Sequence, residues 1–158
     1  MIRNKTNILL RKAKPCELDT IYTMGLDVWG IGTSLEDYLH QCRASSKYQS
    51  GTWYVLTEKD QLIASVIVYC SGFALQEGCV GIGSVATQPS QRRKGYGAKL
   101  IQLLALELLK THHTLFLHSD IHPAYYQRLG FRPFRKSGSC MYMTHLQSDN
   151  RLTQPNYF

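Results

Sequence analysis

Three consecutive runs in the middle of the chain are rich in β-branched and aromatic residues and are separated by polar turns. They span residues 52–58, 61–70 and 79–87. Such a composition is typical of β-strands, and the residues "EKDQ" at 58–61 fit a tight hairpin between the first two runs. Pro89 ends the third run, because proline cannot donate a ladder hydrogen bond. The pattern predicts three neighbouring strands joined mainly as antiparallel hairpins.

Apolar residues at helical spacing precede these strands. A short strand within residues 7–14 is followed by a predicted helix over 15–29, with proline at its start and acidic residues in its first turn. The residues "GIG" at 30–32 break that helix. Ser34 then caps a second helix that runs to about Ala44. The polar stretch 45–51 is predicted to be a loop.

The second half of the chain mixes both patterns. The expected elements are a helix over 97–110 that is apolar nearly all round, a strand over 114–119, a short helix over 122–130 and strands over 131–134 and 139–146. A strand, a helix and a strand in succession require a parallel pair with a right-handed crossover. The order β-α-α-β-β-β-α-β-α-β-β therefore predicts an α/β (mixed α+β) fold, with a mixed, mostly antiparallel central sheet and helices on both faces.

Length and composition limit the number of domains. The chain has 158 residues, of which 44% are hydrophobic and 18% charged, as in ordinary globular proteins. We expect one domain over residues 1–146 and a polar, loosely held extension over 147–158. The sequence has no apolar run long enough to span a membrane and no signal peptide, so a cytoplasmic location without membrane association is expected.

Cysteine and histidine suggest neither disulfide nor metal chemistry. The cysteines are odd in number and form no CxxC motif, so reduced thiols are expected at Cys16, Cys42, Cys70, Cys79 and Cys140. His118 and His122 are four residues apart, but a strand end separates them. We therefore predict no metal site.

Charge is distributed unevenly along the chain. The net charge is +7, yet residues 15–42 contain five acidic residues and no lysine or arginine, so the rest of the chain carries +12. A basic excess alone is compatible with nucleic acid, a membrane surface or an anionic small molecule. The chain therefore has one acidic segment and a basic remainder, and this distribution is more informative than the total charge.

The stretch "RRKGYG" at 92–97 places three cations and two glycines at the start of a helix. Positive charge is unfavourable there by up to about 1 kcal/mol per residue, unless an anion is bound. Glycines let a ligand approach backbone N–H groups, and the helix dipole adds to the attraction for phosphate. The spacing matches neither a P-loop nor a dinucleotide-binding fingerprint. An incidental basic turn is the alternative interpretation of this stretch taken alone.

Two motifs in the right order resemble the GNAT superfamily, the acyl-CoA-dependent N-acyltransferases. "RRKGYG" fits the family signature Arg/Gln-x-x-Gly-x-Gly/Ala, and "SVATQPSQ" at 84–91 is similar to the family's fourth strand and its exit. "AYYQRLGF" at 124–131 resembles the second motif, where a tyrosine precedes Gly-Phe by four residues. The predicted element order over residues 8–146 is also similar to that of the family.

The resemblance implies a set of ligand-binding positions. The loop would hold the pyrophosphate of acetyl-CoA, the acyl donor, largely through backbone N–H groups. Val85 and Thr87 would bind the pantetheine arm through their main chain, and this strand and the next would splay apart to admit the thioester. The loop residues concerned are Arg92, Arg93, Lys94, Gly95, Tyr96, Gly97 and Ala98.

Acylation of an amine by a thioester requires a proton donor for the departing thiolate. The resemblance gives that role to Tyr126, whose phenol is protonated at neutral pH. Tyr125 is the alternative if the register slips by one residue, and packing is the alternative role for Tyr126. Many family members carry a general-base glutamate in the fourth strand, whereas "GIGSVAT" at 81–87 contains no carboxylate. A base among His118, Ser119, Asp120 and His122, or a chain of waters, remains open.

The first two predicted helices suggest where the acceptor binds. In the family these helices form much of the acceptor side, so Glu36 and Asp37 would attract a cationic amine, with Trp29 and Tyr38 as apolar or cation–π walls. A solvated acidic helix face is the alternative. The acceptor would be a small-molecule amine, a protein N-terminus or a lysine, and the protein a monomer or homodimer.

The sequence therefore predicts an N-acetyltransferase that acts by direct attack in a ternary complex. A catalytically weak acyl-CoA-binding regulatory domain is the first alternative, because the strand carboxylate is missing. A basic RNA-associated domain is the second, although charge segregation argues against nucleic acid as the partner.

Overall fold

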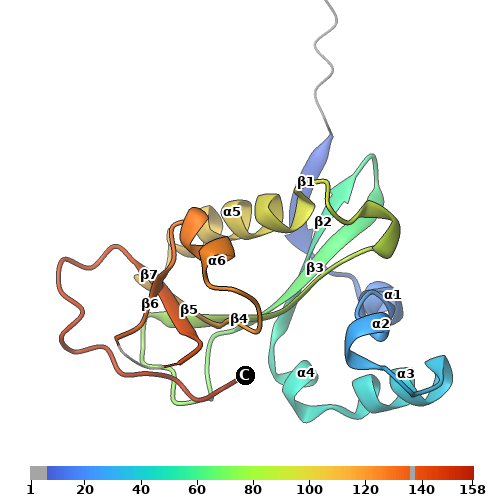
Figure 1. Ribbon diagram of the computed structural model, residues 1–158, viewed down its shortest axis with the longest axis horizontal. Coiled ribbons are helices and arrows are strands. Elements are labelled where there is room, and N and C mark those ends of the chain that lie inside the picture. The colour runs from blue at the N-terminus through green and yellow to red at the C-terminus, as the bar shows by residue number, and fades with distance from the viewer. Residues whose placement is uncertain (1–6, 136–137) are drawn as a thin grey trace, which may run out of the picture. The chain divides into compact units, whose positions relative to one another are not determined.

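The computed structural model describes residues 7–135 and 138–158 (Figure 1). A seven-stranded sheet has the strand order β1-β2-β3-β4-β5-β7-β6. Its strands are β1 (Ile8–Lys12), β2 (Thr52–Glu58), β3 (Gln61–Tyr69), β4 (Cys79–Thr87), β5 (Thr114–His118), β6 (Arg132–Pro133) and β7 (Cys140–Thr144). The helices are η1 (Pro15–Glu17), α1 (Leu18–Thr23), α2 (Leu26–Trp29), α3 (Leu35–Ala44), α4 (Ser46–Ser50), η2 (Pro89–Gln91), α5 (Tyr96–Leu108) and α6 (Ala124–Arg128).

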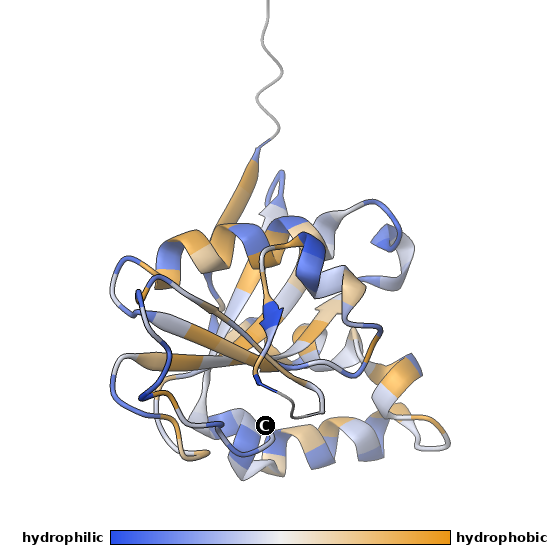
Figure 2. Ribbon diagram, turned by 60° about the vertical axis from the view of Figure 1, so that its left-hand side comes forward, coloured by the Kyte–Doolittle hydropathy of each residue, from blue (hydrophilic) through white to orange (hydrophobic). Residues whose placement is uncertain are grey.

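The predicted fold class is confirmed. The pair β4–β5 is parallel, while β1–β2, β5–β7 and β6–β7 are antiparallel, which makes the sheet mixed and mostly antiparallel. The central strands are largely apolar, whereas the helices carry both kinds of residue (Figure 2). None of the helices in the described ranges is long and apolar enough to cross a membrane. Contacts divide the chain into two compact units, Met1–Ile67 with Ser84–Leu100, and Val68–Gly83 with Ile101–Phe158.

The first unit contains the predicted hairpin. β1 pairs with β2 from Ile8↔Glu58 to Lys12↔Tyr54. Lys59 and Asp60 join β2 to β3 with φ values of 49° and 65°. Two successive positive φ values match the twist of the flanking strands, so a two-residue turn closes this hairpin as the sequence predicted.

The N-terminal helical region differs from the prediction in two places. The helix expected over 15–29 is interrupted at Gly25, where the Trp29 ring packs against the glycine backbone and leaves no room for a side chain. The loop expected over 45–51 contains α4, which is capped by Ser45 accepting from the backbone N–H of Tyr48 at 3.2 Å. Ser34 caps α3 as predicted, accepting from the Asp37 N–H at 3.2 Å.

The second unit is built around β5. β4 pairs with β5 over three residues only, from Cys79↔Thr114 to Gly81↔Phe116, whereas β5 pairs with β7 along its whole length to His118↔Cys140. Leu115, Phe116, Phe131 and Phe134 are at most 1% exposed and form the core.

The C-terminal residues are packed, contrary to the prediction of a loosely held extension. Leu152 and Phe158 are 4% and 5% exposed. Arg135 Nη2 donates to the Leu152 carbonyl at 2.6 Å, and the Asn156 N–H donates to the Phe73 carbonyl at 2.7 Å. The segment lacks periodicity because its buried residues are isolated anchors, a pattern that hydropathy alone does not detect.

Candidate active site

The loop between β4 and α5 combines two left-handed residues. Arg93 has φ 63° and Gly95 has φ 84°. A Cβ placed on Gly95 would meet no atom within 4 Å, so the glycine serves the backbone conformation and faces open space. Alternation of left-handed residues in a short loop turns successive N–H groups to one side, which is the geometry of anion-binding nests.

The backbone donors of this loop are available. The first hydrogen bond of α5 runs from the Lys99 N–H to the Gly95 carbonyl at 3.1 Å, so the N–H groups of Tyr96, Gly97 and Ala98 precede the helical ladder. Within residues 7–135 and 138–158, no acceptor bonds the N–H groups from Arg93 to Ala98. Together with the helix dipole they form a site suited to an anion.

Arg92 points away from these donors. Its guanidinium forms a two-pronged ion pair with Asp27 of α2, at 2.5 and 2.9 Å. It also donates to the carbonyls of Thr87 at 3.2 Å and Met24 at 3.0 Å. The Arg92 hydrogen bond lowers the pKa of Asp27 below its usual value. Arg92 thus ties the start of the loop to the helical region, and its backbone N–H donates to the Pro89 carbonyl at 3.5 Å.

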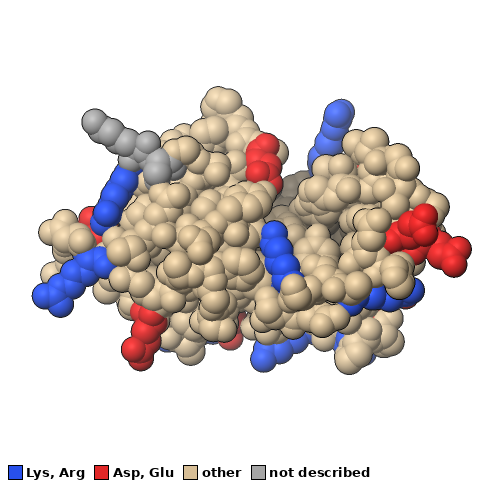
Figure 3. Space-filling model, turned by 90° about the horizontal axis from the view of Figure 1, so that it is seen from below, with Lys and Arg blue, Asp and Glu red and all other residues tan. Residues whose placement is uncertain are grey.

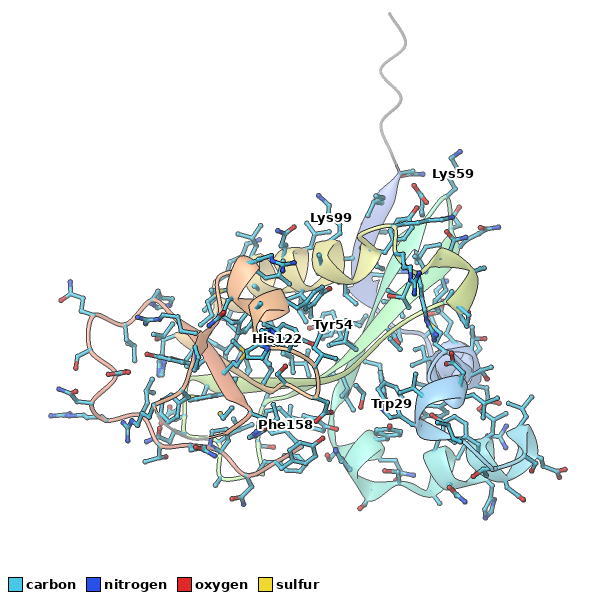
Figure 4. The ribbon with its side chains drawn as sticks, in the orientation of Figure 1. Trp29, Tyr54, Lys59, Lys99, His122 and Phe158 are labelled. Carbon is cyan, nitrogen blue, oxygen red and sulfur yellow. The ribbon has the colours of Figure 1, made fainter. Side chains whose placement is uncertain are left out.

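The other side chains of the loop differ in the hydrogen bonds that they form. Arg93 is exposed, and its side chain has no hydrogen bond or ion pair to any residue that the structure describes. Lys94 Nζ donates to Gln91 Oε1 at 3.1 Å, on the surface. The Tyr96 hydroxyl donates to Glu58 Oε2 at 2.5 Å, which anchors the first turn of α5 to β2 and raises the pKa of Tyr96. Lys59 and Lys99 project outward from the β2–β3 turn and α5 (Figure 4).

β4 carries an irregularity just before the predicted pantetheine-binding residues. Ser84 has φ 48° in the middle of the strand, a conformation that is uncommon for a residue with a side chain. Its side chain hydrogen bonds Tyr48. Such a residue redirects the strand that follows, here Val85 to Thr87, all of which are half-buried. Sequence reasoning missed this feature, because serine gives no signal for a positive φ.

Tyr126 lies on α6 in the second compact unit. Its ring packs edge-on against Tyr125 at 5.1 Å and Phe131 at 6.0 Å between centroids. Burial, followed by the charges of Tyr125 and Asp120, raises the pKa of Tyr126 to about 12. The phenol is therefore protonated at neutral pH. Its hydroxyl makes no hydrogen bond within the described part of the chain, so it remains available as a donor.

The four candidates for a general base lie at the end of β5 and in the loop that follows it. His118 Nε2 lies 3.0 Å from the Asn156 carbonyl and must carry the proton in that bond. His122 Nδ1 accepts from the Ala124 N–H at 3.2 Å. Ser119 donates to the Ile121 carbonyl at 2.7 Å, and Asp120 accepts from the Tyr157 hydroxyl at 3.1 and 3.2 Å.

The predicted acceptor residues differ in accessibility. Trp29 is 47% exposed, and Glu36 and Asp37 are exposed in the first turn of α3. Tyr38 is 5% exposed, beneath Gly30, and forms part of the core. In Figure 3 acidic side chains gather where Figure 1 draws α3.

Three of the five acidic residues in segment 15–42 are already paired with arginines. The ion pairs are Glu17 with Arg11 at 2.8 Å, Asp19 with Arg43 at 2.6 Å, and Asp27 with Arg92. The acidic segment of the sequence is therefore largely neutralised in the fold. Glu36 and Asp37 are the two acidic residues of the segment without such a partner in the described ranges.

Two further features concern other kinds of site. A groove of about 510 Å³ is lined by His118 and by residues Gln154–Tyr157 of the C-terminal segment. Among the residues that the structure describes, no group of three or more histidine, cysteine or acidic residues could hold a metal ion.

The predicted site residues belong to different compact units. The predicted loop and strand positions lie in the first unit with the acceptor candidates, and Tyr126 lies in the second.

Comparison with solved structures finds the same fold in acetyltransferases. A GNAT family acetyltransferase from Brucella melitensis in complex with acetyl-CoA has a TM-score of 0.66 at 17% identity, with 96% of this chain and 94% of that chain covered. An aminoglycoside acetyltransferase in complex with coenzyme A has a TM-score of 0.65 at 22% identity, with coverages of 87% and 95%. A chimera of the spermidine N-acetyltransferase from Vibrio cholerae has a TM-score of 0.64 at 15% identity, with coverages of 87% and 95%.

Sequence comparison identifies the family. No curated protein matches the chain by sequence. The family model described as "Acetyltransferase (GNAT) domain" matches residues 49–133, which run from the end of α4 through the loop, α5 and α6 to β6. This match covers more than half of the chain and includes both motifs on which the resemblance rested. The chain therefore belongs to the GNAT acetyltransferase family.

Proposed function

We propose that this protein transfers an acetyl group from acetyl-CoA to a primary amine, by direct attack in a ternary complex. The observation that carries the proposal is the loop from Arg93 to Ala98, with its unpaired backbone N–H groups at the start of α5. A pyrophosphate supplies the oxygen acceptors and negative charge that these groups require. Arg93 and Lys94 add full positive charges at the rim.

The remaining contacts with acetyl-CoA, the acyl donor, come from residues of β4. Val85 and Thr87 bind the pantetheine arm through main-chain groups, and the Val85 N–H is the candidate donor to the oxyanion of the tetrahedral intermediate. The Thr87 carbonyl already accepts from Arg92, which fixes the end of the strand. Arg92 is in this scheme a positioning residue, because its N–H donates to the Pro89 carbonyl and its guanidinium binds Asp27.

Tyr126 completes the reaction. The neutral amine attacks the thioester carbonyl and forms the C–N bond, and the C–S bond then breaks. The Tyr126 hydroxyl donates a proton to the departing thiolate, for which its raised pKa of about 12 keeps it in the protonated form. The amine loses its proton to water or to a base among the polar residues after β5.

The acceptor that fits best is a small cationic amine. Glu36 and Asp37 provide carboxylates that form no ion pair with any described residue, and the exposed Trp29 provides a ring face for a cation. Tyr38 supports this region from the core beneath Gly30. Solved structures of similar fold include enzymes named for spermidine and for aminoglycosides, both of which are polyamines in chemical class.

Binding and turnover distinguish this function from a binding-only domain. We expect calorimetry to detect acetyl-CoA binding, and a thiol-release assay to detect turnover with at least one of spermidine, an aminoglycoside, an amino acid or a peptide N-terminus. Binding without turnover across this panel would favour an acyl-CoA-binding regulatory domain, to which the absence of a carboxylate in 81–87 already points. An absence of binding by folded protein would refute both.

A further inference from the structure

The C-terminal residue of the chain is buried against the sheet. Phe158 is 5% exposed, and its ring lies 4.8 Å from the His118 ring and 5.6 Å from the rings of Tyr69 and Phe73. These partners come from the end of β5, the end of β3 and the loop after β3. All of them belong to the second compact unit. Figure 4 labels Phe158 beside β4.

Two glycines of β4 make room for this ring. A Cβ on Gly81 would lie 2.5 Å from Phe158 Cζ, and a Cβ on Gly83 would lie 3.7 Å from Phe158 Cδ2. The first distance excludes any side chain while the ring is present, and the second is ordinary van der Waals contact. Because Gly81 and Gly83 project to the same face of β4, the ring rests on bare backbone along this part of the strand.

The ring lies where β4 and β5 cease to pair. Their parallel register ends at Gly81↔Phe116, while β5 continues to His118 with β7 on its other side. Phe158 contacts Gly83 on β4 and His118 on β5, and both of these residues lie beyond the last pair between β4 and β5. It therefore closes the point at which the two strands separate.

The segment that carries Phe158 is held at several positions. The Asn156 N–H donates to the Phe73 carbonyl at 2.7 Å, the Asn156 carbonyl accepts from His118, and the Tyr157 hydroxyl binds Asp120. The two residues before Phe158 are thus held by the loop after β3 and by the end of β5 with the loop that follows it. Such anchoring is expected of a residue that shapes a binding site rather than one that covers a surface loosely.

We propose that Phe158 limits the length of the acyl group that the enzyme accepts, by filling the space where β4 and β5 separate. This inference rests on the proposed function, because it takes the thioester to lie in that opening. The wall fits a hydrocarbon, because the rings of Phe158, Tyr69 and Phe73 pack together and offer apolar surface.

The size of the expected effect follows from burial. Each methylene group that moves from water into an apolar space gains about fourfold in affinity, which is about 0.8 kcal/mol. Phe158→Ala removes the ring and leaves space for the two extra methylenes of a butyryl group. The ratio of butyryl-CoA to acetyl-CoA affinity is then expected to rise on the order of tenfold relative to the wild type.

Calorimetric titration with acetyl-CoA, propionyl-CoA and butyryl-CoA tests the inference without knowledge of the acceptor. Phe158→Ala is compared with the wild type and with Tyr157→Phe, which removes the hydrogen bonds to Asp120 but keeps both rings. We expect the ratio of butyryl-CoA to acetyl-CoA affinity to rise in Phe158→Ala and to stay at the wild-type value in Tyr157→Phe. If Phe158→Ala does not fold, Phe158→Leu, which keeps an apolar anchor, should show a smaller rise in the same direction.

The two proposals fail in different ways. Normal acetyl-CoA binding with an unchanged butyryl-to-acetyl ratio in the folded Phe158 variant would overturn the acyl-length inference alone. An equal rise in Tyr157→Phe would also overturn it, because disorder of the segment rather than ring volume would then explain the change. An absence of acetyl-CoA binding by the wild type would refute the proposed function itself.

Discussion

Arg92 and Arg93 are adjacent in the sequence but have different predicted roles, which a pair of alanine variants separates. The Arg92 guanidinium forms an ion pair with Asp27 and donates to two backbone carbonyls, whereas the Arg93 side chain is exposed. Arg92→Ala should therefore lower stability, and Arg93→Ala should lower affinity for acetyl-CoA. The two variants remove the same charge, so each is the control for the other.

The magnitude for Arg92 follows from its contacts. Its side chain is 34% exposed, which weakens the ion pair by solvent screening. The bonds to the carbonyls of Thr87 and Met24 are partly buried and use a charged donor, and together they contribute about 2 kcal/mol. For a chain of this size that loss lowers Tm by about 4–8 °C. Arg93→Ala should change stability by less than about 0.5 kcal/mol.

Thermal unfolding without ligand and calorimetry with acetyl-CoA at two salt concentrations measure the two effects. We expect Arg93→Ala to bind more weakly and with a smaller salt dependence, because it removes an exposed charge next to the bound phosphates. Equal Tm values for Arg92→Ala and Arg93→Ala would refute the structural role of Arg92. If Arg93→Ala binds acetyl-CoA with wild-type affinity and salt dependence, the Arg93 side chain does not contribute to phosphate binding.

Three further predictions address other parts of the molecule. Tyr126→Phe should lower kcat by at least tenfold and leave the KM for acetyl-CoA nearly unchanged, since the phenol acts on the leaving thiolate; an unchanged kcat would exclude it as the acid. Gly81→Ala should destabilise the wild type but cost less in a Phe158→Ala background, so a double-mutant cycle in urea should give a non-zero coupling energy, and strict additivity would contradict the packing. Arg11 holds the pKa of Glu17 at about 2, below its ordinary 4.5, so its stabilisation is present above pH 4.5 and is lost as the pH falls toward 2. Glu17→Gln should therefore show a smaller fall in Tm between pH 6 and pH 3, by a difference corresponding to about 1 kcal/mol after screening; parallel curves would contradict this.

Local patterns predicted the sheet well because they act within a few residues. The two-residue turn at Lys59–Asp60, the cap at Ser34 and the strand ended by Pro89 each depend on neighbours along the chain. The short helix α4 was missed, since five polar residues give no periodic signal. The break at Gly25 was also missed, because it depends on how the Trp29 ring folds back.

The sequence was sufficient to predict the motif of the candidate site, but it did not predict the tertiary contacts around it. The glycine and cation spacing of the loop, together with the motif at 124–131, indicated the family, and the anion site stays a prediction. The conformation of Ser84 and the burial of Phe158 left no trace in the sequence, because they depend on partners such as Tyr48 and Gly81 that are distant along the chain. Tertiary contacts of this kind follow from topology, and a local window does not contain them.

The acidic segment shows how such contacts change a functional argument. In the sequence, five acidic residues over 15–42 suggest a strong field for a cationic acceptor. In the fold, ion pairs with Arg11, Arg43 and Arg92 neutralise these acidic residues in part. The three pairs involve Glu17, Asp19 and Asp27, and the last of them holds the start of the loop before α5. The attraction for an amine then depends on Glu36 and Asp37, both exposed and subject to screening. If the acceptor binds here as proposed, we expect electrostatics alone to give little selectivity, and shape and apolar contact around the exposed Trp29 to supply the rest.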